Sequence, residues 1–331
     1  MKTAFSPLLG IVTIALAGCS SATPVQRALP LTQTASLDHT AQPAASGGLT
    51  ELFNLDYSSG TITVFSVANG KAKSTAHFAP GGGLAQGLAS DAKGRIYTTL
   101  TASTSRSSPC AACVQIFNAG GTLVRQLDAP TLKSGSGPPS LTDISVDAHD
   151  NIYVSDYGQQ AVYFYPRGEA RKRGPTVVVQ NSQNAASVLS TPNGKNVIVS
   201  GGCGFASVRP FTRTAKGKYS QGSCFGIGTI ALIGGAVDNQ EDVLTPVDGG
   251  PGLVSISSPS GGGSFRVPDP RGSISGVALN ADSSIAYVAD HNKERVYAYA
   301  RPADGWVSSG APKLLATYKG FKNLDIIAVP Q

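Results

Sequence analysis

One short pattern recurs along this chain and limits the folds open to it more than any other feature of the sequence. Its clearest copies are Gly87–Tyr97, Asp143–Tyr153 and Gly276–Val288, with weaker copies at Ser187–Val199 and Gly234–Leu244. Each copy alternates apolar and polar residues, passes a turn-forming Asp, Asn or Gly, and alternates again, which is typical of a β-hairpin. Self-similarity at this spacing predicts an array of similar supersecondary units.

A second signature accompanies these copies: an aspartate lies six positions before the first apolar residue of another alternating run. The four pairs are Asp56 and Ile62, Asp156 and Val162, Asp248 and Val254, and Asp290 and Val296. The run predicts a third strand, and the residues before the next copy leave room for a fourth, outer strand. A repeat of roughly 42 to 56 residues suits a four-stranded propeller blade.

The two ends of the sequence each hold part of one unit. Asn323–Val329 reads as an inner strand with nothing after it, and Leu49–Asp56 reads as a second strand with no inner strand before it. Pairing the two segments completes a blade and removes the open sheet edges that invite aggregation. The predicted fold class is therefore all-β, a six-bladed β-propeller closed by pairing of the N- and C-terminal segments.

The run Val288–Ala298 carries a more specific likeness, Val-Ala-Asp-His-Asn-Lys-Glu-Arg-Val-Tyr-Ala. It resembles the repeat of NHL-type propellers, the class of the YVTN and gluconolactonase-like proteins, in which a valine–alanine–aspartate strand end precedes a short turn. The resemblance covers nearly the whole chain after its leader, strongly in three repeats and loosely in the others. In two repeats Leu100 and Gly201 replace the aspartate, beside loops that carry cysteines.

The first residues have the parts of a secretory signal peptide. Lys2 supplies a positive charge, and the apolar stretch from about Ala4 to Ala17 is shorter than the roughly 20 residues of a membrane-spanning helix. The run Leu16-Ala-Gly-Cys19 resembles the lipobox of bacterial lipoproteins. That resemblance implies cleavage before Cys19 and acylation of its thiol. An ordinary signal peptide that contains a cysteine is the alternative.

The leader divides the chain into three predicted parts: a lipoprotein signal peptide over 1–18, a lipidated flexible tether over 19–48 and the propeller over 49–331. The tether contains Ser, Thr, Ala, Pro and Gln and shows little hydrophobic periodicity. Ser20 stands where an acidic residue would indicate retention in the inner membrane. The resemblance therefore implies a protein held to membrane lipid through Cys19, at the outer membrane and facing the periplasm.

Composition agrees with many short strands, because the chain has 39 glycines, one Met, one Trp and no clear amphipathic helix. The formal charge of +6 becomes +5 once the single leader residue Lys2 is removed. The basic residues are scattered apart from Arg167 and Arg171–Arg173, in a predicted turn. Nucleic-acid binding needs a basic face with interleaved aromatic residues, so no nucleic-acid partner is predicted. The cluster is interpreted as a solvated hairpin tip, with contact to anionic lipid or cell-wall polymer as the alternative.

Four cysteines remain besides Cys19, and an even number in an exported chain favours disulfides. Of the three pairings we favour Cys110–Cys113 and Cys203–Cys224. Cys110-Ala-Ala-Cys113 also fits a redox or zinc motif. However, no thioredoxin-like βαβ pattern surrounds it and no second CxxC completes a zinc site.

The recurrent aspartates have two interpretations. At the end of a second strand a carboxylate can accept N–H bonds from the turn, which predicts structural turn carboxylates. The alternative is a ring of carboxylates that forms a cation site on one face. The residues concerned are Asp56, Asp156, Asp248 and Asp290.

Gluconolactonase-like propellers hold a divalent metal in the central channel, with an acid and an amide at the starts of inner strands. The corresponding positions here carry no charge, and they are Gln86, Thr142, Ala186, Ile233 and Ser275. Asp143 is one position off and Glu51 lies in a different strand, whereas a hard divalent ion favours several oxygen ligands with carboxylates among them. We therefore predict no metal or other cofactor and no catalytic residue, and a bound divalent cation is the alternative.

Catalysis by a nucleophile has no motif to support it. The histidines His39, His77, His149 and His291 fall in the tether, an outer-strand end or turns. No Gly-x-Ser-x-Gly elbow precedes a helix. The glycine runs Gly81–Gly83 and Gly261–Gly263 are interpreted as inter-strand loops rather than phosphate loops, since no helix start follows them.

The longest departure from the repeat is the 13-residue segment Thr101–Cys113. This segment and Cys203 lie on the face formed by the loops after second and fourth strands. Cys224 lies near that face. Recognition usually sits on loops held by a rigid scaffold. The hypothesis is a membrane-anchored envelope lipoprotein whose propeller binds an envelope protein or small ligand on that loop face. A binding role is favoured over an enzymatic one. The alternative is a metal-dependent hydrolase or lyase of the gluconolactonase-like type.

Overall fold

A computed structural model describes residues 48–81, 83–102, 110, 112–132, 137–168, 175–180, 185–200, 206–227, 234–247, 252–307 and 310–330. All of them belong to the second of two compact units of the chain, residues 42–331. The predicted signal peptide and Cys19 lie outside the described residues. The described part contains 25 strands and two short 3₁₀ turns, η1 (Pro166–Gly168) and η2 (His291–Lys293). None of its helices is long and apolar enough to span a bilayer.

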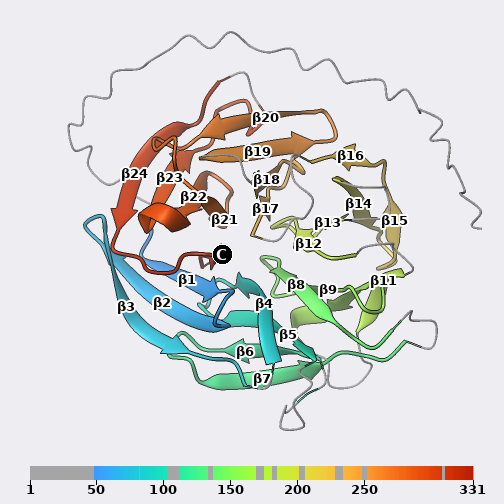
Figure 1. Cartoon of the computed structure of the whole chain (residues 1–331). Helices are drawn as coiled ribbons and strands as arrows, with labels where there is room; N and C mark the ends of the chain where they lie inside the picture. The colour runs from blue at the N-terminus through green and yellow to red at the C-terminus, as the bar shows by residue number, and fades with distance from the viewer. Residues whose placement is uncertain are drawn as a thin grey trace, which may run out of the picture. The chain divides into compact units, whose positions relative to one another are not determined.

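The described strands form six antiparallel units arranged radially around one axis (Figure 1). Blade 1 consists of β25 (Ile326–Ala328), β1 (Glu51–Asp56), β2 (Thr61–Ala68) and β3 (Lys71–Phe78). Blade 2 consists of β4 (Gly83–Ser90), β5 (Ile96–Ala102), β6 (Cys113–Phe117) and β7 (Leu123–Asp128). Blade 3 consists of β8 (Leu141–Val146), β9 (Ile152–Asp156), β10 (Ala161–Tyr165) and β11 (Thr176–Gln180).

The second half of the ring repeats the arrangement. Blade 4 consists of β12 (Val188–Ser190), β13 (Asn196–Ser200), β14 (Ser207–Arg213) and β15 (Tyr219–Gln221), with β16 (Phe225–Gly226) also paired to β14. Blade 5 consists of β17 (Ala236–Val237), β18 (Val243–Pro246), β19 (Leu253–Ser258) and β20 (Gly261–Arg266). Blade 6 consists of β21 (Ile274–Leu279), β22 (Ile285–Asp290), β23 (Arg295–Ala300) and β24 (Lys313–Lys319). The all-β propeller fold predicted from the repeat is confirmed, and the described strands group into the six units above. One prediction within blade 5 is wrong, because Gly261–Gly263 begins β20 instead of forming a loop.

The hydrophobic core lies between blades rather than within one layer. Each of its six clusters joins two neighbouring blades. Ile116 of blade 2, for example, belongs to one cluster with Ile152 and Tyr163 of blade 3, and Phe53 of blade 1 to another with Ile96 and Phe117 of blade 2. The middle strands β9 and β10 are buried along their whole length, as expected for sheets covered on both faces. A blade therefore cannot bury its apolar residues without both neighbours.

A turn-forming aspartate closes the inner hairpins of blades 2, 3 and 5 by the same hydrogen bonds. Asp91 accepts the backbone N–H groups two and four positions ahead, at 2.9 and 3.0 Å. Asp147 does so at 2.8 and 3.0 Å, and Asp238 at 2.7 and 3.0 Å. All three carboxylates are buried. The recurrence of Asp at this position is thus explained by donors in its own turn.

The chain ends meet in blade 1, where β1 pairs with β25. Asn54 lies in this seam and is fully buried. Its Nδ2 donates to the carbonyl of Asn323 at 2.7 Å, and its Oδ1 accepts the N–H of Asp325 at 2.8 Å. The N–H of Tyr57 donates to the Asp325 carboxylate at 3.0 Å. One amide side chain therefore satisfies two backbone groups of the closing segment, and the predicted pairing of the chain ends is confirmed.

Replacing Asn54 should loosen this closure. We predict that Asn54→Ala lowers the free energy of unfolding by about 2 to 4 kcal/mol, because two buried backbone groups lose their partner. Urea denaturation followed by tryptophan fluorescence measures the change. Asn118→Ala is the matched control, since Asn118 accepts one bond from Thr122 in an exposed hairpin. Equal effects of the two substitutions would contradict the role given to Asn54.

Candidate functional site

The central channel holds a cavity of about 70 Å³ between the inner strands. Its lining combines small aliphatic side chains, such as Ala89 and Val277, with the hydroxyls of Ser90, Ser145 and Ser190. No charged side chain lines it in the described part of the chain. A cavity of this size is well below the 300 Å³ or so of a small-molecule site. Among the described residues, the channel is therefore too narrow for a small-molecule pocket.

The predicted channel-facing positions at the starts of the inner strands hold neutral groups. The hydroxyl of Thr142 bonds that of Ser155 at 3.0 Å, and Ser275 donates to the carbonyl of Leu324 at 2.9 Å. Gln86 and Ala186 are half-buried, and Ile233 lies outside the described residues. Within the described ranges no three His, Cys, Asp or Glu side chains come together. The donor set of a divalent cation site is thus not found there.

Asp143 is a buried carboxyl near the axis that the sequence pattern does not explain. It occupies the repeat position that Gly87 and Gly276 hold in blades 2 and 6, and it is 5% exposed. Its carboxyl accepts the N–H of Ile144 at 2.9 Å and, across the blade boundary, the N–H of Val188 at 3.1 Å. Burial raises the pKa of Asp143 to about 7, although both hydrogen bonds favour the ionised form. Asp143 thus links the inner strands of blades 3 and 4.

The strand-end aspartates accept hydrogen bonds from their own turns and from the segment before the adjacent inner strand. Asp156 is fully buried and accepts the N–H groups of Ser140 and Gln159, at 2.9 and 3.0 Å, and the Tyr163 hydroxyl at 3.0 Å. Asp290 accepts the N–H groups of Ser273 and Lys293 at 3.1 and 3.3 Å. These contacts are those of turn carboxylates. Asp248 lies outside the described residues.

Asp56 makes the same kind of turn in blade 1. It accepts the N–H groups and the hydroxyls of both Ser58 and Ser59. Partial burial opposes its charge, but the four hydrogen bonds outweigh burial and lower the pKa of Asp56. The turn that carries Tyr57 is therefore held by a carboxylate that stays ionised at neutral pH.

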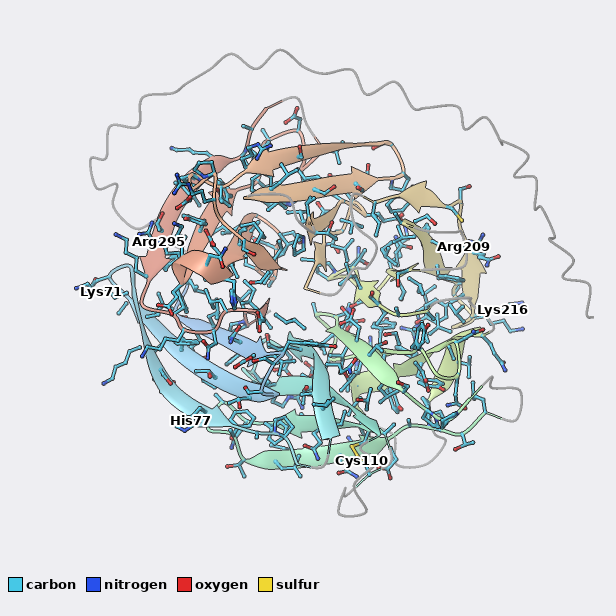
Figure 2. The ribbon with its side chains drawn as sticks, viewed as in Figure 1. Lys71, His77, Cys110, Arg209, Lys216 and Arg295 are labelled. Atoms are coloured by element: carbon cyan, nitrogen blue, oxygen red, sulfur yellow. A yellow bond between two sulfur atoms is a disulfide. The ribbon has the colours of Figure 1, made fainter. Side chains whose placement is uncertain are left out.

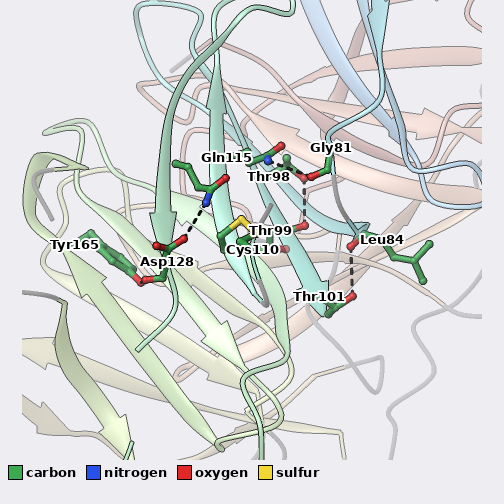
Figure 3. Close-up of a disulfide and its surroundings, with 11 residues drawn as sticks. Gly81, Leu84, Thr98, Thr99, Thr101, Cys110, Gln115, Asp128 and Tyr165 are labelled. Atoms are coloured by element: carbon green, nitrogen blue, oxygen red, sulfur yellow. Dashed lines mark hydrogen bonds between the residues drawn. A yellow bond between two sulfur atoms is a disulfide. The ribbon is translucent and has the colours of Figure 1, made fainter. Parts of the chain in front are cut away.

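A disulfide joins Cys110 to Cys113, whose Cα atoms are 6.0 Å apart (Figure 3). Cys113 is the first residue of β6 and is fully buried. Cys224 is disulfide-bonded as well, and Arg209 donates to its sulfur at 3.1 Å. Cys203 lies outside the described residues, so the predicted pair Cys203–Cys224 stays a prediction.

The predicted insertion Thr101–Cys113 is shorter in the structure than the sequence indicated. Thr101 and Ala102 still belong to β5, where Thr101 pairs with Leu84, and Cys113 already belongs to β6. Removing the whole segment Thr101–Cys113 would therefore cut into two paired strands.

Three large exposed apolar side chains lie on the face with the disulfide, which we call the upper face. Tyr57 is 51% exposed, Leu84 62% and Tyr157 51%. Tyr57 and Tyr157 each follow a strand-end aspartate, in the turns β1–β2 and β9–β10, and Leu84 lies at the start of β4. Patches of exposed apolar residues on a soluble domain mark interaction surfaces.

Backbone contacts connect these three residues across blades 1 to 3. Gly60, at the end of the Tyr57 turn, faces the backbone of Ala85 beside Leu84. Thr101 donates to the carbonyl of Leu84 at 3.4 Å (Figure 3) and forms a β-bridge with Ser140. Ser140 in turn accepts the N–H of Tyr157 at 2.9 Å. We call the set Tyr57, Leu84, Thr101, Ser140 and Tyr157 the upper strip.

The upper strip itself, Tyr57, Leu84, Thr101, Ser140 and Tyr157, contains no basic residue. The labelled residues Lys71, Arg209, Lys216 and Arg295 lie around the circumference, on blades 1, 4 and 6 (Figure 2). His77 lies at the end of the outer strand β3, and His291 begins η2, where its ring contacts Asp325 at 3.1 Å.

Comparison with known proteins defines the class of this protein. No protein-family model and no curated protein matches the chain. The match to a chain of a nidogen–laminin complex covers 85% of this chain and 98% of that one, with a TM-score of 0.53 and 14% identity. The match to hydrazine synthase of Kuenenia stuttgartiensis covers 82% of this chain and 84% of that protein's chain (TM-score 0.51, 14% identity). The match to the periplasmic gluconolactonase PpgL of Pseudomonas aeruginosa covers 81% of this chain and 79% of that protein's chain (TM-score 0.50, 14% identity). The chain is a β-propeller protein, and likeness at this identity shows the fold alone.

The raised pKa of Asp143 gives stability a defined pH dependence. The ordinary value is 3.8 and the folded value about 7, so the folded state binds the extra proton between them. The contribution of Asp143 to the free energy of unfolding is largest below its ordinary pKa. It decreases by at most about 1.4 kcal/mol per pH unit as the pH rises toward 7.

We predict that Asp143→Asn removes this part of the slope between about pH 4.5 and pH 7. Urea denaturation of both proteins at several pH values gives the difference. Asp304→Asn, which removes an exposed carboxyl after β23, controls for the change in net charge. Parallel stability curves for wild type and Asp143→Asn would show that the buried carboxyl is ionised throughout.

Proposed function

We propose that this chain is a lipid-anchored protein of the bacterial cell envelope whose propeller binds a partner protein through the upper strip. The observation that carries the proposal is the row of exposed residues Tyr57, Leu84 and Tyr157 on three successive blades. A partner protein fits better than a small ligand, because the strip is exposed and the channel cavity measures only about 70 Å³.

The chemistry of the strip favours recognition. Tyrosine supplies a large contact area with only two rotatable side-chain bonds, and it is enriched where binding energy concentrates. The turns under Tyr57 and Tyr157 are fixed by Asp56 and Asp156. Groups held in place before binding lose less entropy when a partner docks. The Cys110–Cys113 disulfide fixes the backbone just before β6, next to the strand that ends at Thr101 and Ala102.

Membrane attachment rests on the sequence. Leu16-Ala-Gly-Cys19 resembles a lipobox, and the segment after it has the composition of a tether. Each buried acyl CH₂ contributes roughly 0.8 kcal/mol, so two or three chains hold a protein on a bilayer. Ser20 favours the outer membrane, facing the periplasm, over retention at the inner membrane. The partner is then another envelope protein within reach of the tether.

The alternative hypothesis, a metal-dependent hydrolase or lyase of the gluconolactonase-like type, gains only the fold from the likeness to PpgL. Its chemistry needs a carboxylate-containing donor set at the channel. The described residues that line the channel are neutral. We therefore prefer the binding role.

The upper strip should carry the binding energy. We predict that Tyr57→Ser with Tyr157→Ser abolishes crosslinking of the chain to its envelope partner in intact cells, because both aromatic contacts are lost. The control replaces two equally exposed apolar residues of the outer strand β7, Leu123→Ser with Val124→Ser, and should crosslink like the wild type. The reverse pattern would place the interface on the outer edge of blade 2.

Acylation of Cys19 should determine where the protein is found. We predict that Cys19→Ser abolishes incorporation of a labelled fatty acid and moves the protein from the membrane fraction to the soluble envelope fraction. The neighbouring substitution Ser20→Ala should change neither result. Retention of the label by Cys19→Ser would contradict lipidation at this residue.

A further inference from the structure

A second cavity opens on the face opposite the upper strip, where the inner hairpins of blades 3 and 4 meet the η1 turn of blade 3. It measures about 350 Å³. Three basic side chains line it, those of His149, Arg167 and Arg213, together with the amides of Asn151 and Asn193. A cavity of this volume falls in the range of small-molecule sites.

Contacts position the side chain of Arg213 and the backbone of Arg167. The guanidinium of Arg213 lies 4.7 Å from the centre of the Phe164 ring, a cation–π contact. Arg167 has a φ of +46°, a conformation uncommon outside glycine. Its N–H donates to Asn151 Oδ1 at 3.1 Å, which fixes this turn over the cavity. Backbone strain of this kind is frequent at ligand sites.

The local charge balance is positive. The carboxylate beneath the cavity, Asp147, has no exposed side-chain surface and already accepts four hydrogen bonds, two from backbone N–H groups and two from Asn151 Nδ2 and the Tyr153 hydroxyl. It lies 4.0 Å from Nδ1 of His149. Among the described residues no carboxylate forms an ion pair with Arg167 or Arg213. Two guanidinium groups therefore face the cavity with their charges uncompensated by that part of the chain.

We infer that this cavity binds a phosphate group. Arginine presents a planar set of donors that matches phosphate oxygens in pairs, and the two asparagines add neutral groups beside them. The ligand is either a soluble phosphate monoester or the phosphodiester of a lipid headgroup, because both present the same oxygens to the arginines. This inference does not depend on the partner proposed for the upper strip.

Calorimetric titration of the purified full chain tests the inference with three probes: inorganic phosphate, glycerol 3-phosphate as a monoester, and glycerophosphoglycerol as a diester. At least one should bind, and Arg167→Gln and Arg213→Gln should each weaken it about tenfold or more, since a charge-assisted contact is lost. Arg213→Lys should recover part of the affinity. Arg271→Gln, on the upper face, should leave binding unchanged.

A preference for the monoester identifies a soluble ligand, and a preference for the diester identifies a lipid headgroup. Absence of binding by all three probes overturns the inference, as does affinity that both arginine variants leave unchanged. The variants are compared by circular dichroism and urea midpoint. If Arg213→Gln lowers the midpoint because its contact with Phe164 is lost, Arg167→Gln decides the outcome.

Discussion

The structure depends on burial between blades, which is satisfied only when the ring is closed. Each hydrophobic cluster joins two neighbouring blades, so the first and last blades need each other as much as any other pair. The seam is formed by three paired residues of β25 and by the amide of Asn54. Apolar burial of roughly 25 cal/mol per Å² drives this assembly, and the buried hydrogen bonds fix its register.

Buried aspartates stabilise the turns on both faces of the propeller. The inner-hairpin aspartates, such as Asp147, satisfy N–H groups on one face, and the strand-end aspartates, such as Asp156, do so on the other. In these turns a buried aspartate binds the backbone, and an exposed residue close to it in sequence supplies the surface chemistry. Tyr157 follows Asp156 directly on one face, and His149 lies two positions after Asp147 on the other. The two faces therefore carry different chemistry on one scaffold.

Much of the fold could be predicted because the repeat reports strand order and because a half unit at each end requires closure. The errors lie where the pattern carries no side-chain information. Gly261–Gly263 forms a strand through backbone pairing with Ile256–Ser258, although glycine shows no alternation. The sequence could not show that Asp143 is buried with a raised pKa, because part of its environment, the N–H of Val188, comes from blade 4. The upper strip left a signal in the sequence, an Asp-Tyr pair in two repeats, whereas its continuity depends on backbone contacts between blades.

The most direct test of the account is the hydrogen-exchange rate of the closing segment, residues 323–329, in the native protein. A closed ring predicts that the amides of β25 exchange as slowly as those of the buried strand β9, because both are released only by global unfolding. Exchange of 323–329 at the rate of exposed turns, while β9 stays protected, would show that the ring is open at this seam and would contradict the account.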